Sequence, residues 1–347
     1  MLNKFLVIGG AGFIGANIAD YLLQNNAEVI IFDNLSRKGT IENLKWLEKK
    51  HKGKKLEMVV GDIRIDKSKL LELIQKVDTV YHLAAQVAVT CSVNNPYEDF
   101  MINAMGTFNV LEAVRHAKNN PILIFASTNK VYGGMEDIEI ADKGDRHEYK
   151  NLPLGIPENR LLDFHSPYGC SKGAADQYVR DYSRIYGLRA VVFRQSCIYG
   201  KRQFGIEDQG WVAWFTIAAS LGCPITIYGD GKQIRDVLYV EDLIQAFVMA
   251  TKMIDKTAGK IYNIGGGPEN TMSLLELISY LKKMLDKDIQ YSFAPWRPGD
   301  QPVYVSDIRK AKKEFGWEPQ ISTSQGVKKL ADWVSRNKEL FRKLKLV

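Results

Sequence analysis

Residues 5–15 read F-L-V-I-G-G-A-G-F-I-G, and this stretch decides the fold. A short apolar strand runs into Gly9, Gly12 and Gly15. This spacing suits a tight turn, close approach of a pyrophosphate and close packing of the helix that follows. The N-terminal amides of that helix would point at the phosphates. The pattern predicts a cradle for a dinucleotide.

A second strand, Glu28–Phe32, ends at Asp33, about twenty residues beyond the glycines. A carboxylate at this position can accept hydrogen bonds from both ribose hydroxyls, and it would repel a 2′-phosphate. The sequence therefore favours NAD over NADP. Arg37 and Lys38 leave NADP open, because their positive charges could bind a 2′-phosphate. Glycines after a strand also form ordinary turns, but here strand, glycines, helix, strand and acid follow in the order that dinucleotide binding requires.

The composition predicts a cytosolic globular protein. The 347 residues are 46% apolar, enough for one large domain or two moderate ones. We find no signal-peptide pattern before the first strand and no apolar run of membrane-spanning length, so no membrane partner is expected. The four scattered cysteines lack the spacing of metal or redox sites, and no metal is expected. The basic residues behind the net charge of +7 are dispersed, which indicates solvated helix faces and not a nucleic-acid site. A basic balance also suits an anionic diphosphate ligand.

Strands and helices continue to alternate, which is typical of a doubly wound parallel sheet of the Rossmann type. Further strands are predicted at Leu56–Val60, Thr79–His82, Pro121–Ala126 and Arg189–Arg194. A helix from Pro96 to Lys118 is expected to carry Phe100, Asn103, Met105, Phe108, Leu111 and Val114 inward. The buried amide of Asn103 would be either an anchor for neighbouring backbone or part of a polar network that reaches the site.

The sequence predicts two lobes, an NAD-binding Rossmann domain and a smaller, discontinuous α/β lobe for the substrate. The first comprises residues 1–194, with 239–256 and 261–266 returning to it. The second comprises residues 195–238 and 267–347. Ligands of such sheets bind beyond the carboxyl ends of the strands. The residues expected to contact NAD are Gly9, Gly12, Phe13, Ile14, Gly15, Asp33, Asp62, Ile63, Leu83, Ala84, Ala85, Asn103, Tyr168 and Lys172.

The strongest catalytic pattern is Tyr168-Gly-Cys-Ser-Lys172. Residues four apart share a helix face, so the lysine ammonium can lie near the phenol and lower its pKa from about ten. The tyrosine could then take a proton from a sugar hydroxyl as a hydride leaves the carbon. Thr128, at a strand end, could hold the same oxygen, or it could simply cap a turn.

Two loop arginines are candidates for the substrate diphosphate. Arg235 lies in G-K-Q-I-R-D and Arg297 in W-R-P-G-D. Guanidinium groups bind phosphate oxygens in a bidentate manner. The alternative is that each forms a surface ion pair with a neighbouring aspartate. Asn129, beside the threonine, is a further candidate for substrate binding.

Together these motifs resemble the extended short-chain dehydrogenase/reductases that act on nucleotide sugars, over nearly the whole chain. Within that family, residues 163–178 and 202–211 resemble the epimerases that invert C2 of CDP-linked hexoses such as CDP-paratose. The resemblance implies a tightly held NAD, a catalytic Thr128, Tyr168 and Lys172, and a CDP-sugar substrate that passes through a 2-keto intermediate. It also implies a homo-oligomer, a dimer or tetramer, formed by the helices that begin near residues 96 and 168.

Two relatives of this layout fit less well. Sugar-nucleotide 4,6-dehydratases follow the threonine with Asp-Glu, whereas Asn129 and Lys130 stand here, and an amide does not deliver a proton as a carboxylic acid does. UDP-sugar 4-epimerases usually have Asn where Cys197 stands. A UDP-sugar 4-epimerase remains the alternative enzyme, and a non-catalytic NAD-binding sensor is the alternative outside enzymes.

Overall fold

The computed structural model describes residues 3–297 and 299–344, so the predicted outer limits of the lobes, residues 1 and 347, lie outside the described residues.

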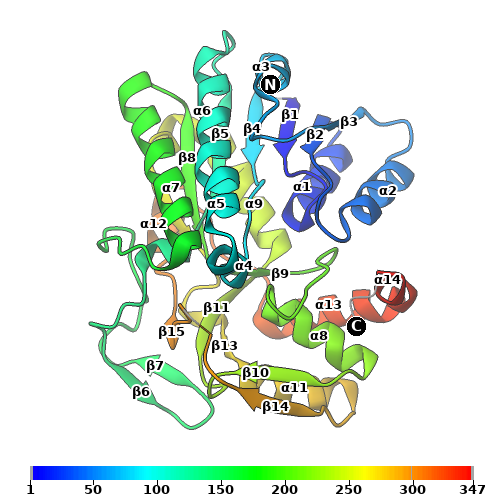
Figure 1. The fold of residues 1–347 in the computed structure, drawn as a ribbon, viewed down its shortest axis with the longest axis vertical. Coiled ribbons are helices and arrows are strands. Elements are labelled where there is room, and N and C mark those ends of the chain that lie inside the picture. Colours follow the sequence, from blue (N-terminus) through cyan, green and yellow to red (C-terminus); the bar gives the residue numbers. More distant parts are fainter. Residues whose placement is uncertain (1–2, 298, 345–347) are drawn as a thin grey trace.

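A seven-stranded sheet forms the upper half of the molecule (Figure 1). Its strands, in order across the sheet, are β12 (Ile261–Ile264), β8 (Ala190–Gln195), β5 (Ile122–Thr128), β4 (Thr79–His82), β1 (Lys4–Ile8), β2 (Glu28–Asp33) and β3 (Leu56–Val60). All neighbours pair in parallel, which confirms the predicted fold class.

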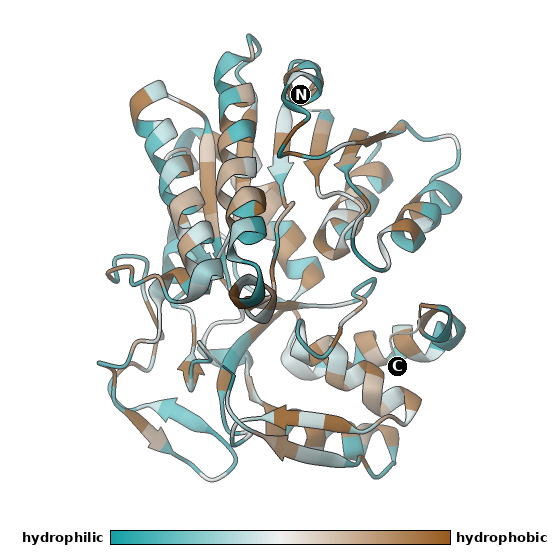
Figure 2. Ribbon diagram, in the orientation of Figure 1, coloured by the Kyte–Doolittle hydropathy of each residue, from teal (hydrophilic) through white to brown (hydrophobic). Residues whose placement is uncertain are grey.

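Helices cover both faces of this sheet because successive side chains of a strand point to opposite faces. On β1, Phe5 and Val7 belong to one core and Leu6 and Ile8 to the other. Most strands of the sheet are apolar, as parallel strands buried on both faces should be (Figure 2). The first core includes residues of α1 (Phe13–Gln24), α2 (Thr40–Lys50) and α9 (Val240–Lys252). The second includes residues of α3 (Lys67–Ile74), α6 (Gly106–His116) and α7 (Ser166–Tyr186).

The predicted helix from Pro96 to Lys118 is interrupted. It consists of α5 (Pro96–Phe100), a π-helical segment, Met101–Met105, and α6, and a short α4 (Val89–Asn94) precedes it. Asn103 lies buried in the π-helical segment, whereas Phe100, which we expected to face inward, is 50% exposed. A π-helical turn is wider than an α-helical turn, so it changes the direction in which the side chains point. The apolar stripe predicted from the α-helical repeat of 3.6 residues per turn is therefore not continuous here.

The lower lobe is organised around β11 (Ile234–Tyr239), which pairs with three short strands. These partners are β9 (Cys197–Tyr199), β13 (Thr271–Ser273) and β15 (Val303–Tyr304). A second small sheet joins β10 (Ile225–Tyr228) to β14 (Tyr291–Ala294) in parallel. The helices of this half are α8 (Trp211–Leu221), α11 (Leu274–Leu285), α13 (Thr323–Arg336) and α14 (Lys338–Lys343).

The remaining elements join the two halves. The excursion predicted between Gly134 and His165 contains a hairpin of β6 (Ile140–Asp142) and β7 (His147–Tyr149). Near the sheet, α10 (Ile254–Thr257) follows α9, and the last of the joining helices is α12 (Arg309–Phe315). Phe315 stacks on Phe193 of β8, so α12 packs against the sheet. None of the helices formed by the described residues is both long and apolar enough to cross a bilayer.

Candidate active site

The turn between β1 and α1 brings the backbone close to the end of β4. Gly9 has φ +81°, and a Cβ added there would lie 2.6 Å from the amide nitrogen of Ala84. A Cβ on Gly15 would lie 2.3 Å from the carbonyl oxygen of Gly9. These contacts leave room only for hydrogen, which is the reason for glycine at both positions. The amides of the first turn of α1 consequently open onto a free cavity, as a bound pyrophosphate requires.

That cavity has a volume of about 460 Å³, within the range of small-molecule sites. It is lined by eleven of the residues expected to contact NAD: Gly9, Gly12, Phe13, Ile14, Gly15, Asp33, Asp62, Ile63, Leu83, Ala84 and Ala85. Asn103, Tyr168 and Lys172 do not line it. The crowded turn and the shape of this cavity fit a dinucleotide, and we call it the cofactor cavity.

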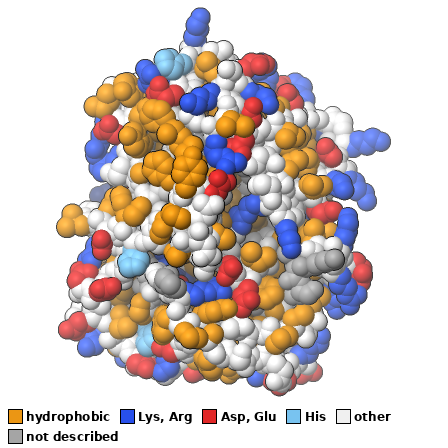
Figure 3. Space-filling view, in the orientation of Figure 1, with side chains coloured by type: hydrophobic (Ala, Val, Ile, Leu, Met, Phe, Trp, Pro, Cys, Tyr) orange, Lys and Arg blue, Asp and Glu red, His pale blue; other side chains and the backbone are white. Residues whose placement is uncertain are grey.

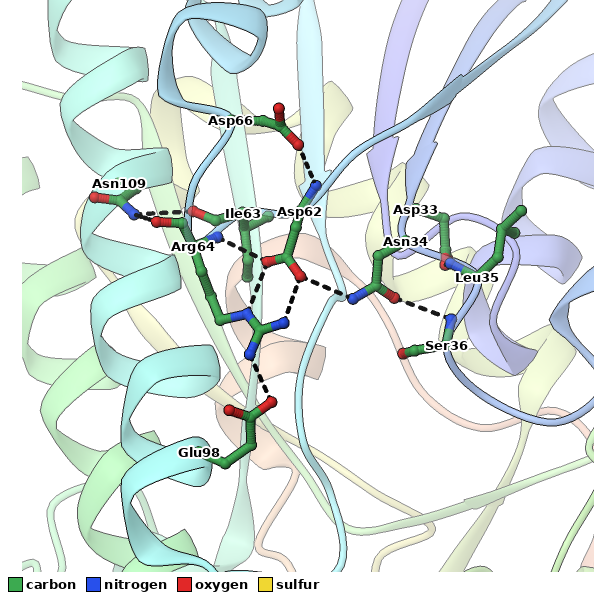
Figure 4. Close-up of polar contacts among 10 residues, drawn as sticks. All are labelled: Asp33, Asn34, Leu35, Ser36, Asp62, Ile63, Arg64, Asp66, Glu98 and Asn109. Atoms are coloured by element: carbon green, nitrogen blue, oxygen red, sulfur yellow. Dashed lines mark hydrogen bonds and ion pairs between the residues drawn. The ribbon is translucent and has the colours of Figure 1, made fainter.

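Two acids of the cofactor cavity differ in how they are engaged. Asp33 accepts hydrogen bonds from the amides of Ala11 (3.0 Å) and Leu35 (2.8 Å), and burial raises its pKa. Each of its oxygens keeps a lone pair for a ribose hydroxyl. Asp62 instead pairs with Arg64 at 2.7 Å and accepts from Asn34, and Arg64 lowers its pKa to about 2 (Figure 4).

The catalytic candidates lie where β5 ends and α7 begins. The Thr128 hydroxyl accepts a hydrogen bond from the amide of Lys130 at 3.2 Å, so it does cap the turn that follows. The hydroxyl donates to Asn129 Oδ1 at 3.3 Å, and its contact with the phenol of Tyr168 partly offsets the rise that burial causes in the pKa of Tyr168. The cap and the contact with the phenol are therefore compatible, and Thr128, Asn129 and Tyr168 line one cavity.

The charges around Tyr168 differ from the expectation. Lys172 Nζ donates to the carbonyl oxygen of Ala126 at 2.6 Å, and burial lowers the pKa of the ammonium to about 7. Burial also raises the pKa of Tyr168 to about 12. The expectation that Lys172 brings the pKa of the phenol below its usual value is wrong for this arrangement. Burial destabilises the phenolate more than the neighbouring groups stabilise it.

A second cavity of about 360 Å³ begins at Tyr168 and extends into the lower lobe. We call it the substrate cavity. Phe13, Ile14, Val87 and Gln209 line both cavities, so the two adjoin. The substrate cavity brings together all three residues expected to bind substrate, Asn129, Arg235 and Arg297. These come from strand ends and loops more than 160 positions apart in the chain.

The two arginines of the substrate cavity have different partners. Arg235 is 7% exposed and donates to the carbonyl oxygen of Ile234 at 2.7 Å, while Asp236 turns away and accepts from Ser196. Arg297 pairs with Asp208 at 3.1 Å and lies over the Tyr228 ring at 3.7 Å. Neither arginine pairs with the aspartate nearest to it in sequence. A buried guanidinium without a carboxylate partner among the described residues makes Arg235 the stronger anion site.

Sequence reasoning missed three polar groups of this cavity. Gln195 Nε2 and Gln233 Oε1 are buried and have no hydrogen-bond partner among the described residues. Such atoms usually have a partner, so both indicate a ligand. Gln195 could have been found from its place at the carboxyl end of β8. Lys130 donates to the carbonyl oxygen of Gly299 at 2.9 Å, and burial lowers its pKa to about 8.

One loop covers both cavities. Within residues 204–210, Ile206 and Gln209 line the cofactor cavity and Glu207 and Asp208 line the substrate cavity. Arg37, from the cofactor side, donates to the side chain of Gln209. The loop lies in one of the two stretches that suggested a CDP-sugar enzyme.

Comparisons with known proteins agree with this geometry. The family model described as GDP-mannose 4,6 dehydratase matches residues 6–330. CDP-paratose 2-epimerase of Salmonella typhi is 47% identical over 96% of this chain and 99% of its own length.

Solved structures show the same fold. UDP-glucuronic acid 4-epimerase from Bacillus cereus, in complex with UDP-glucuronic acid and NAD, is 29% identical, with a TM-score of 0.82 over 96% of this chain and 99% of that one. The dTDP-glucose 4,6-dehydratase DesIV from Streptomyces venezuelae, with NAD bound, is 28% identical, with a TM-score of 0.83 over 98% and 99%. The chain therefore belongs to the extended short-chain dehydrogenase/reductase family of nucleotide-sugar enzymes.

Proposed function

We propose that the chain is an NAD-dependent epimerase that inverts C2 of a CDP-linked hexose, of the CDP-paratose to CDP-tyvelose type. The observation that carries this proposal is that Tyr168 and Thr128 line the substrate cavity, which adjoins the cofactor cavity along Phe13, Ile14, Val87 and Gln209. The 47% identity to CDP-paratose 2-epimerase over nearly the whole chain supports the choice of sugar and base.

The chain's own residues would divide the proton transfer between them. Tyr168 takes the proton of the C2 hydroxyl, and Thr128 holds the same oxygen by a hydrogen bond. NAD bound in the cofactor cavity would supply the acceptor and donor of the hydride, and its positive nicotinamide would favour the phenolate. Lys172 adds a positive charge beside the site when it is protonated. The 2-keto sugar must then present its other face, and no net oxidation results.

The cofactor would be held mainly by backbone. The glycine turn from Gly9 to Gly15 takes the pyrophosphate, and Asp33 takes the adenosine ribose. The carboxylate of Asp62 contributes less to cofactor binding than the sequence suggests, because it already accepts hydrogen bonds from Arg64 and Asn34. The diphosphate of the substrate would lie against Arg235 and Arg297.

Asn129 and Lys130 support epimerisation over dehydration. Removing water from a sugar needs an acid and a base beside the ring. Both residues line the substrate cavity, and neither offers a carboxyl group. The substrate supports the route to inversion separately. In a 3-deoxy sugar a 4-keto group would not acidify the C2 proton, because C3 lies between them, and direct oxidation at C2 avoids that difficulty.

The reaction can be tested directly. The purified protein is incubated with CDP-paratose, CDP-glucose and UDP-glucose, and the sugar stereocentres are followed by NMR. We expect inversion at C2 of a CDP-sugar. Inversion at C4 of UDP-glucose alone would show the alternative enzyme, a UDP-sugar 4-epimerase. No turnover of any of the three, with NAD still bound, would favour a non-catalytic sensor.

We also propose a homo-oligomer. Exposed apolar and aromatic side chains gather over α5 to α7 (Figure 3), and the most exposed are Tyr97, Phe100, Tyr178, Ile185 and Tyr186. An apolar patch of this kind marks an interaction surface. Sedimentation should show a dimer or tetramer for the parent and a smaller species for Ile185→Glu. A parent that sediments as a monomer at high concentration would contradict the proposal.

A further inference from the structure

A buried carboxylate lies directly behind the catalytic helix. Asp99 of α5 is 1% exposed. Its Oδ2 accepts a hydrogen bond from the hydroxyl of Ser171, the residue before Lys172. Its Oδ1 accepts from the side chains of Asn103 at 3.1 Å and Gln86 at 2.9 Å. The three side-chain donors recorded for Asp99 among the described residues are a hydroxyl and two amides, so none of its hydrogen-bond partners there is a cation.

This arrangement favours an ionised Asp99. Burial raises the pKa of the carboxyl, but three hydrogen-bond donors, each aimed at an oxygen, stabilise the charged form. Asn103, in the π-helical segment that begins two residues later, donates to both Asp99 and Ser171. Asn103 also bonds to the backbone of Gln86 in both directions, so the cluster is fixed on three sides.

Two carboxylates favour the charged form of Lys172, and Asp99 is the one without an ion-pair partner among the described residues. Asp176 of α7 contributes more, but it is paired with Arg194 of β8 at 2.9 Å. His82 of β4 is buried with its pKa lowered to about 3, so it is neutral. Arg37, which follows β2, lies toward the loop 204–210 and lowers the pKa of Tyr168 slightly, and Cys91 of α4 is a free thiol.

We propose that Asp99 is a positioning residue whose buried negative charge, fixed by Ser171, Asn103 and Gln86, sets the pH range in which Tyr168 and Lys172 work. A negative charge favours the protonated form of both groups. It therefore opposes the effect of burial on the Lys172 ammonium, and it also holds the Tyr168 proton more tightly. This inference rests on the proposed function, because it assigns Tyr168 and Lys172 their roles.

The test is Asp99→Asn, which keeps the size of the side chain and removes the charge. Without the charge, both groups lose their protons at lower pH, so both limbs of the kcat/KM profile should move to lower pH by about one unit. Ser171→Ala is the matched control, because it removes a hydrogen bond and leaves the charge. Its rate should fall while the limbs stay in place. A lower profile with unmoved limbs in Asp99→Asn would mean a purely structural role and would overturn the proposal.

A second measurement does not depend on turnover. In protein with bound NAD and ¹³C-labelled lysine Cε, the Lys172 resonance can be assigned from a Lys172→Met variant and titrated by NMR. Its midpoint should be lower by about one pH unit in Asp99→Asn than in the parent. An unchanged midpoint would overturn the proposal even if the epimerase assay failed for another reason. Asp99→Ser removes the same charge with less volume and replaces Asp99→Asn if circular dichroism shows that variant unfolded.

Discussion

The cofactor cavity and the substrate cavity adjoin along Phe13, Ile14, Val87 and Gln209, but they are built in different ways. The cofactor cavity depends on the backbone turn after β1, where added Cβ atoms at Gly9 and Gly15 would collide. The catalytic and substrate-binding candidates of the substrate cavity are instead side chains that lie between residues 128 and 300. A backbone cradle admits little variation, whereas side chains can be exchanged singly. The difference suggests that cofactor binding and substrate choice can be altered independently, and the following variants test that separation.

The largest effect is expected for Gly15→Val. A Cβ at this position meets the carbonyl oxygen of Gly9 at 2.3 Å, and backbone cannot move aside as a flexible side chain can. Overpacking of this kind costs about 3 kcal/mol or more, and the turn that faces the pyrophosphate is displaced. We expect no NAD to remain bound after desalting, together with a lower melting temperature.

Gly53→Ala is the control for this variant. Gly53 also has a positive φ, +83°, but nothing lies within 4 Å of its added Cβ. Its cost should be the backbone strain alone, about 1–2 kcal/mol, with NAD retained. If Gly15→Val kept NAD as well as Gly53→Ala does, crowding would not be what defines the cradle.

Tyr168→Phe should separate the two cavities most cleanly. Removing a positioned proton acceptor lowers kcat by about 10²–10⁴-fold. The phenol lines the substrate cavity and not the cofactor cavity, so NAD retention should stay at the parent level. Tyr291→Phe, at a tyrosine that is 40% exposed, serves as the control and should leave both unchanged. Turnover as fast as that of the parent would remove the proton-transfer role from Tyr168.

The same difference explains how far the sequence predicted the molecule. The cradle is contiguous and limited by sterics, so the spacing of its glycines predicted the strand, turn and helix as they are. The sequence predicted that Asn103 is buried and has polar partners, but it could not identify them, because they lie in α5, α7 and the segment after β4.

The substrate cavity was harder to predict than the cradle. Gln195 and Gln233 carry no local motif, and the buried positions that leave them without partners arise only when β8, β11 and the loops around them pack together. The same is true of the balance of charges at Tyr168. The spacing of Tyr168 and Lys172 is visible in the sequence, but the burial that outweighs it is not.

Arg235→Gln should affect the substrate alone. Loss of a charge-assisted hydrogen bond costs about 1.5–3 kcal/mol, which corresponds to a rise in KM of roughly 10–100-fold. NAD retention should not change, because Arg235 lies outside the cofactor cavity. Arg309→Gln, at an exposed arginine paired with Asp307, is the control and should leave KM as it is. An equal rise in both variants would point to general electrostatics and not to a phosphate site.

Gln209→Ala should give the smallest effect. It is the one variant expected to change both NAD binding and KM for the substrate. Gln209 lines both cavities and accepts a hydrogen bond from Arg37. Losing one hydrogen bond costs about 0.5–1.5 kcal/mol, so NAD should dissociate roughly 2–10-fold faster. KM for the substrate should rise as well, because the same loop carries Glu207 to Arg297.

Gln290→Ala, at a glutamine whose side chain bonds only to Asp288 among the described residues, is the control for NAD dissociation by stopped-flow and for KM. Faster NAD release with an unchanged KM would show that the loop belongs to the cofactor side alone. If both quantities change, NAD binding and KM can be altered independently at every other position tested, and only the loop 204–210 affects both. That loop then couples retention of the cofactor to binding of the substrate.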